Sequence, residues 1–147
     1  MARKMPQNLE AEMSVLGVAF LDDKLISKIV EEVNEDMFYD DRNKKLFQAI
    51  KSLHEQSIAI DVTTVSNELD KTKNFSAVGG IEYLTEVIDS VATAANLDYY
   101  INIIKEKAIV RNLINTATDI VTEAYEEEDN VTSLLDTAEK NILDVVR

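Results

Sequence analysis

The chain has 147 residues, of which 28 are Asp or Glu and 15 are Lys or Arg, so its formal net charge is −13. It contains no Cys, which excludes a disulfide framework, a cysteine-ligated zinc site and a cysteine nucleophile. An apolar fraction of 46% in a chain of this length is enough for one domain with its own core, and it argues against global disorder.

The negative charge also bears on possible partners. Proteins hold nucleic acids mainly through Lys and Arg that neutralise phosphates, and the densest basic stretches here are only Arg3-Lys4 and residues 42–45. We therefore expect no direct DNA binding by this chain. No apolar run approaches the roughly 18–20 residues that span a bilayer, so we expect no membrane association and a cytoplasmic location.

Three Gly and one Pro leave few obligatory breaks, which favours an all-α fold. The first helix is predicted after a flexible segment at residues 1–7, with Asn8 as its cap. Its apolar positions follow helical spacing at Leu9, Met13, Leu16 and Phe20. Gly17 lies inside this helix at a propensity cost of roughly 1 kcal/mol, which indicates close backbone packing at that point.

Four further helices complete a predicted globular head over residues 8–93. They are a short helix after Asp22-Asp23, a third between about residues 41 and 56, a fourth capped by Asp61, and a fifth after the break at Gly79-Gly80. Residues 58–62 alternate apolar side chains as a strand would. We predict a loop there, because the sequence offers no partner strand.

The chain from residue 94 onward has a different pattern, which predicts a projecting two-helix hairpin over residues 94–147. Residues 94–125 contain no Gly or Pro, so a helix of roughly 48 Å is possible. The acidic stretch at residues 126–130 predicts a turn, and apolar residues at a heptad-like spacing predict a last helix after it.

This hairpin carries more apolar surface than its own two helices can cover. The surplus predicts self-association, although folding back of the hairpin onto the head would also cover it. The apolar positions of the long helix include Val110, Leu113, Ala117 and Val121, and those of the last helix include Leu135 and Ile142.

We find no catalytic residues and no metal site in the sequence. The single histidine, His54, excludes every site that needs two, and the few glycines form neither a phosphate-binding loop nor a nucleophile elbow. The acidic run at residues 126–129 lacks the spacing of a calcium loop and is best explained as a solvated turn. We expect this chain by itself to be no enzyme and to hold no cofactor.

A set of short motifs, in order along nearly the whole chain, resembles the N-terminal domain of bacterial replicative DNA helicases of the DnaB type. The opening, PQNLEAE followed by SVLG at residues 6–17, carries part of the likeness. It is densest at residues 93–96, at Tyr99-Tyr100 and at residues 106–114. Further matches lie at residues 36–39, 46–50, 60–65 and 79–84. Ala92 departs from the family, whose members usually have Pro before the TAAN segment.

The resemblance implies a helical head and a hairpin through which domains pair, six of them forming a collar that docks primase. It makes the candidate pairing residues Val110, Leu113, Ala117, Val121, Leu135 and Ile142. It places ATP, Mg²⁺ and DNA translocation in a motor domain outside these residues. The primase-related positions of the family match Tyr83, Ile114 and Ile120, for which core packing is the alternative interpretation.

Two other interpretations stay open at this point. The helicase-binding C-terminal domain of bacterial primase resembles the same fold, although the segment at residues 6–17, next to the chain start, favours the helicase. An acidic helical module that binds a small ligand or ion would also fit the composition.

Overall fold

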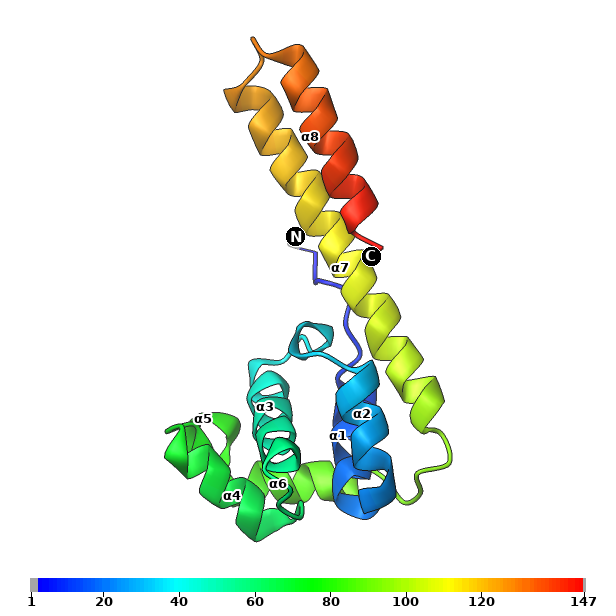
Figure 1. The fold of residues 1–147 in the computed structure, drawn as a ribbon, viewed down its shortest axis with the longest axis vertical. Coiled ribbons are helices and arrows are strands. Elements are labelled where there is room, and N and C mark those ends of the chain that lie inside the picture. The colour runs from blue at the N-terminus through cyan, green and yellow to red at the C-terminus, as the bar shows by residue number, and fades with distance from the viewer. Residues whose placement is uncertain (1–2, 147) are drawn as a thin grey trace. The chain divides into compact units, whose positions relative to one another are not determined.

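The computed structural model describes residues 3–146, and over this range it contains helices but no strands (Figure 1). The predicted all-α class is therefore confirmed. By its contacts the described chain divides into two units. We call residues 7–105 the head, and residues 3–6 together with 106–146 the hairpin unit. The division falls between residues 105 and 106, inside the longest helix, whereas the sequence suggested a boundary between residues 93 and 94.

The head contains each of the five predicted helices. They are α1 (Leu9–Leu21), α2 (Ile26–Glu32), α3 (Asp41–Glu55), α4 (Val62–Lys71) and α6 (Gly80–Asp89), and the first turns of α7 (Leu97–Glu126) complete the unit. Three short elements escaped prediction: η1 (Asp23–Leu25), η2 (Glu35–Met37) and α5 (Phe75–Val78). Elements this short cannot show a helical period. Residues 58–60 form a loop, as predicted.

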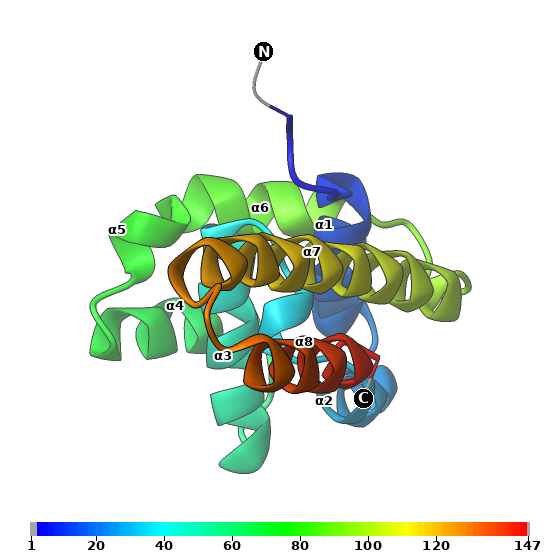
Figure 2. The same ribbon diagram turned by 90° about the horizontal axis from the view of Figure 1, so that it is seen from above.

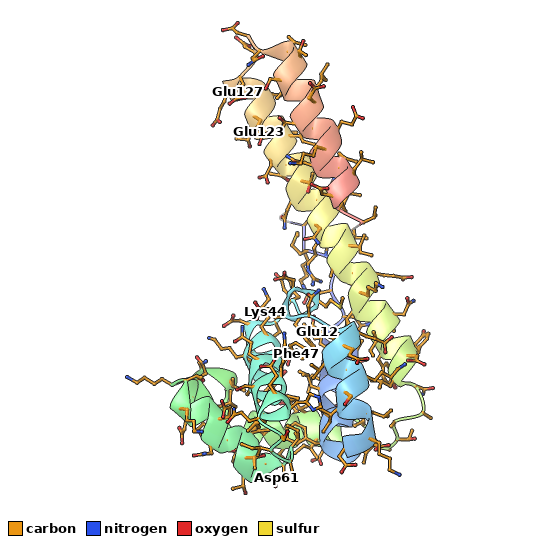
Figure 3. All side chains as sticks on the ribbon, in the orientation of Figure 1. Glu12, Lys44, Phe47, Asp61, Glu123 and Glu127 are labelled. Carbon is orange, nitrogen blue, oxygen red and sulfur yellow. The ribbon has the colours of Figure 1, made fainter. Side chains whose placement is uncertain are left out.

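The predicted caps are present. Asn8 accepts a hydrogen bond from the Ala11 amide at 3.0 Å and so begins α1. Asp61 and Thr64 form a reciprocal capping box at the start of α4, where Figure 3 labels Asp61. Gly79 has a φ of +108°, a left-handed conformation that glycine adopts without strain, and it separates α5 from α6. These local signals fix where the helices begin.

The central helix of the head is α1, and it is more deeply buried than its sequence predicted. The expected apolar face included Leu9, which stays exposed, and Met13 and Phe20, which are half-buried. In contrast, all residues from 14 to 19 are buried. The reason is that α2, α3 and α6 contact α1 from different directions, so a single-face interpretation was too narrow.

Gly17 allows α1 to approach α6 closely. A Cβ atom built on Gly17 would lie 2.7 Å from the carbonyl oxygen of Val87 and 2.8 Å from Cγ2 of Val91. Both distances are too short for a real Cβ contact, so only glycine fits without a shift of the neighbouring chain. The expectation of close backbone packing at this position is confirmed.

In the hairpin unit, α7 continues without a break to Glu126 and α8 (Val131–Asp144) follows a short turn. Figures 1 and 2 show α8 side by side with the second half of α7. The Arg111 guanidinium donates a hydrogen bond of 2.8 Å to the Pro6 carbonyl, which attaches the described N-terminal residues to this unit. Residues 1 and 2 of the segment expected to be flexible lie outside the described range.

Among residues 3–146, no helix is long and apolar enough to cross a membrane.

Candidate self-association surface

The two helices of the hairpin unit carry half-buried side chains that are both polar and apolar, among them Thr116 and Ile120 on α7 and Leu134 and Ala138 on α8. A hollow of about 380 Å³ between them is lined on the α7 side by Asn112, Asn115, Thr116 and Asp119. On the α8 side it is lined by Asn141, Asp144 and Val145. The side of α7 that faces α8 at this point is therefore not the apolar stripe that the sequence displays.

The apolar stripe of α7 points away from α8. With about 100° between successive residues, Val110, Ala117 and Val121 lie roughly half a turn from Asn112 and Asp119. Leu113 is 45% exposed and Val121 is 56% exposed. A helix that exposes large aliphatic side chains to water in this way is typical of a protein interaction surface.

The last helix adds to this apolar surface. None of the residues of α8 is classed as buried, and its exposed large apolar side chains include Leu135, Ile142 and Leu143. We call the exposed side chains Val110, Leu113, Ala117, Val121, Leu135 and Ile142 the hairpin apolar surface. The turn between the helices is strongly acidic, and Figure 3 shows Glu123 and Glu127 near it.

All six predicted pairing residues are thus exposed in the hairpin unit. The structure contains a single copy of the chain, so their pairing itself stays a prediction. The exposure nevertheless meets the first requirement of an interface, which is that the apolar side chains be accessible to a partner.

The three positions that the resemblance linked to primase have different environments. Ile114 is exposed on α7, and Ile120 is half-buried. Tyr83 on α6 is only 4% exposed, so it favours the core-packing interpretation over direct contact with a partner.

Tyr83 belongs to a buried polar network that the sequence did not reveal. The carboxylate of Glu12 on α1 accepts hydrogen bonds from the Tyr39 and Asp40 amides and from the Asn43 side chain, at 2.8, 3.3 and 2.9 Å. Asn43 in turn accepts a hydrogen bond from the Tyr83 hydroxyl. The network joins α1, the start of α3 and α6, and Figure 3 shows Glu12 on α1, with Phe47 on the neighbouring α3.

Arg42 covers the outer side of this network. Its guanidinium lies 4.1 Å from the centre of the Tyr83 ring and forms a salt bridge of 2.9 Å with Asp40. The hydrogen bond and charge of Arg42 lower the pKa of Asp40. Burial raises the pKa of Tyr83 to about 12, against an opposing effect of Arg42. These side chains hold the head together and include no nucleophile or acid–base pair open to a substrate.

One sequence signal for this network exists. Glu12 shares a helix face with Val15, Leu16 and Ala19, which follow it by three, four and seven residues. A carboxylate at such a position is buried only when several donors satisfy it. Asn43 carried no comparable signal, because it comes next to charged residues at the start of α3 and looks like a surface side chain. Tyr39 and Asp40 contribute main-chain amides, which no side-chain pattern marks.

The head and the hairpin unit together define a class: an all-helical domain whose hairpin bears an exposed apolar surface. Residues 4–106 match the family described as DnaB-like helicase N terminal domain. The chain therefore belongs to the family of DnaB-like helicase N-terminal domains.

Similar proteins agree with this assignment. The chain is 43% identical, over 99% of its length, to the replicative DNA helicase DnaC of Bacillus subtilis. It is 39% identical, over 95% of its length, to the replicative DNA helicase DnaB of Geobacillus stearothermophilus. The match spans 32% and 31% of those two proteins, which is about a third of their length.

Two solved structures are similar as well. The N-terminal domain of DnaB helicase from Mycobacterium tuberculosis superposes with a TM-score of 0.90 at 35% identity, over 97% of this chain and 99% of that one. A DnaB-like replicative helicase, whose structure was described together with its interactions with primase, superposes with a TM-score of 0.77. At 20% identity, over 94% of this chain and 31% of that one, the second likeness shows the fold alone. The family match is to the helicase side, so the primase-domain interpretation is not retained.

Proposed function

We propose that this chain is the self-associating, primase-docking N-terminal part of a hexameric, ATP-dependent replicative DNA helicase that unwinds DNA at the replication fork. In this proposal the chain performs no catalysis, and ATP, Mg²⁺ and DNA are bound by a motor domain outside residues 1–147. The observation that carries self-association is the apolar stripe of α7, which faces away from α8.

The energetics support self-association. Burial of one large aliphatic side chain contributes about 1.5–3 kcal/mol, so an interface that covers several of them from each copy offsets the cost of association. Two hairpins pairing through equivalent surfaces give a two-fold dimer, and three such dimers would form a six-membered collar. The net charge of −13 is compatible with this role, because DNA binding is assigned to the motor domain.

For primase docking, the exposure of the candidate residues narrows the choice. Ile114 is accessible on α7, whereas Tyr83 is enclosed by Asn43 and Arg42. We therefore assign direct contact with primase to Ile114 and a peripheral contact with primase to the half-buried Ile120. Tyr83 would act indirectly, through the packing of α6. A DnaB-like helicase of the same fold has described interactions with primase, which supports the choice of partner.

Self-association is tested by light scattering on the 147-residue chain. Leu113→Asp places a charge in the middle of the hairpin apolar surface, and we expect the mass to fall to that of a monomer while circular dichroism stays helical. Thr122→Asp adds the same charge at an exposed position of the same helix and should leave the oligomer intact. A folded Leu113→Asp variant with unchanged mass would refute pairing through the hairpin.

Primase docking is tested separately with Ile114→Asp, in the whole helicase. We expect this variant to weaken primase binding at least about tenfold, which is a loss of about 1.4 kcal/mol. Titration against labelled primase gives the affinity, and a unimodal hexamer in light scattering confirms that assembly persists. Unchanged primase affinity in an intact hexamer would remove Ile114 from the docking site.

A further inference from the structure

The head contains a groove that the proposed function does not use. It has a volume of about 870 Å³ and lies between the first two turns of α1, the end of α6 and the first two turns of α7. All of its lining residues belong to the head, so it is separate from the hairpin apolar surface. We call it the α1–α6–α7 groove.

The charge of the groove is of one sign. Glu10, Glu86 and Asp89 line it and are exposed, while no Lys or Arg does. None of the three carboxylates forms a salt bridge with a described residue. A concave site lined by carboxylates, on a chain of net charge −13, has a negative potential that attracts cationic partners.

The same groove offers aromatic and apolar contacts. Tyr99 and Tyr100 pack edge to face with their ring centres 6.1 Å apart, and Tyr99 remains 67% exposed. An exposed tyrosine face next to carboxylates suits the guanidinium or ammonium group of Arg or Lys. Met13 and Ile103, both half-buried, supply apolar surface against which aliphatic side chains can pack.

A hydroxyl on the wall of the groove offers a polar contact to a ligand. Ser14 is only 8% exposed and lines the groove, yet its hydroxyl has no hydrogen-bond partner among the described residues. Because the hydroxyl is open to the groove and makes no hydrogen bond within residues 3–146, it is free to bond a polar atom of a ligand in place of water. A main-chain carbonyl or amide of a bound peptide provides such an atom.

We propose that the α1–α6–α7 groove binds a cationic amphipathic peptide segment of a partner protein. Basic side chains of the segment contact Glu10, Glu86 and Asp89 and one of them stacks on Tyr99, while aliphatic side chains of the segment cover Met13 and Ile103. A second copy of this chain is a poorer occupant, because two copies of charge −13 repel each other at an acidic surface. The proposal stands on the head alone and does not depend on hairpin pairing.

The test titrates the 147-residue chain into a fluorescein-labelled peptide of about 16 residues in which Lys and Leu follow helical spacing. Fluorescence anisotropy gives the affinity. We expect saturable binding, weakened about tenfold or more by Glu86→Lys combined with Asp89→Lys. The control combines Glu127→Lys with Glu128→Lys, which changes the net charge equally at the hairpin turn and should alter affinity less than about twofold.

A pair of tyrosine variants tests the aromatic contact. Tyr99→Ala should weaken binding about fivefold, as loss of a cation–π contact of about 1 kcal/mol predicts. Tyr125→Ala removes another exposed tyrosine, this one from the hairpin unit, and should have no effect. Equal losses from the groove variants and their controls would show non-specific attraction and overturn the proposal.

Two other outcomes would also overturn it. Absence of saturable binding at low ionic strength would show that the groove takes no cationic peptide. A changed mass of the Glu86→Lys, Asp89→Lys variant in sedimentation, without loss of peptide affinity, would show that the groove is an interface between copies of the chain. Hairpin pairing, tested by Leu113→Asp, can fail or succeed without affecting any of these results.

Discussion

At the scale of single residues, the head depends on one fully satisfied buried carboxylate. Glu12 is almost completely buried and receives three hydrogen bonds, two from the backbone that precedes α3 and one from Asn43. A buried charge without such donors would cost several kcal/mol. Glu12 therefore fixes how α1 packs against the start of α3. The hydrogen bond from Tyr83 to Asn43 fixes α6 to the same network.

The raised pKa of Tyr83 gives the network a pH dependence. The neutral hydroxyl is favoured in the fold, so its stabilising effect is fully present below pH 10 and is lost between pH 10 and about 12 as the unfolded chain ionises first. We expect Tyr83→Phe to cost about 1–2 kcal/mol at pH 8 and to cost less at pH 11. Urea unfolding at the two pH values measures the difference.

The matched control for this prediction is Tyr125→Phe, which changes a solvent-exposed tyrosine of the hairpin unit. It should alter stability at neither pH. If Tyr83→Phe lost the same stability at pH 8 and pH 11, the ionisation of Tyr83 would not contribute to alkaline unfolding.

At the scale of helices, local signals set the ends and tertiary contacts set the depth of burial. The caps at Asn8 and Asp61 begin α1 and α4 as their side chains predict. The depth of α1, in contrast, follows from its contacts with α2, α3 and α6. Gly17 affects both local helix stability and tertiary packing. Its missing Cβ lowers helix propensity and permits the close approach of α1 to α6.

Gly17→Ala measures which of these two effects is larger. Alanine gains about 1 kcal/mol of helix propensity, but its Cβ would overlap a backbone oxygen that cannot rotate away. We expect a net destabilisation of about 1–3 kcal/mol in chemical denaturation. Ser52→Ala in α3 removes a hydrogen bond to Glu68 and should cost about 1 kcal/mol. It serves as a reference for the size of the Gly17→Ala effect. A Gly17→Ala variant as stable as the parent chain would mean that α6 can move away from α1 without a loss of stability.

At the scale of the whole molecule, the two units differ in how they bury apolar surface. The head has a contiguous core that includes Leu16, Phe38, Phe47 and Leu84, all nearly inaccessible to solvent. The last helix of the hairpin unit has no buried residue in the single chain. In our proposal, the head is stable by itself whereas α8 gains much of its stability from a second copy.

Hydrogen exchange tests this difference. Amides of α1 should be protected to the same degree at all protein concentrations, because their protection depends on the head core alone. Amides of α8 should exchange rapidly in dilute solution, and their protection should rise by tenfold or more as concentration increases and hairpins pair. Mass spectrometry of peptides from both helices provides the comparison in one sample. Protection of α8 that did not vary with concentration would show that its stability is internal to the chain.

Sequence patterns alone predicted the helical class, the ends of most helices, the hairpin turn and the close contact at Gly17. Those features depend on neighbours along the chain: on caps, on glycine, and on apolar residues repeating every three or four positions. The resemblance to the helicase family rested on short motifs in a fixed order, and these can be recognised without knowledge of the fold. The surplus apolar surface of the hairpin was also visible in the sequence, and the resemblance assigned the pairing candidates to it, which stay a prediction.

Only the tertiary structure decided which side of each helix faces protein and which faces water. It lined a hollow between α7 and α8 with polar residues and left Val110, Leu113 and Val121 exposed. It enclosed Tyr83 and gave Glu12 its three donors. It also brought three carboxylates and two tyrosines from distant parts of the chain to one groove. Helical periodicity fixes which residues share a face, but the partner of that face is set by contacts between residues far apart in sequence.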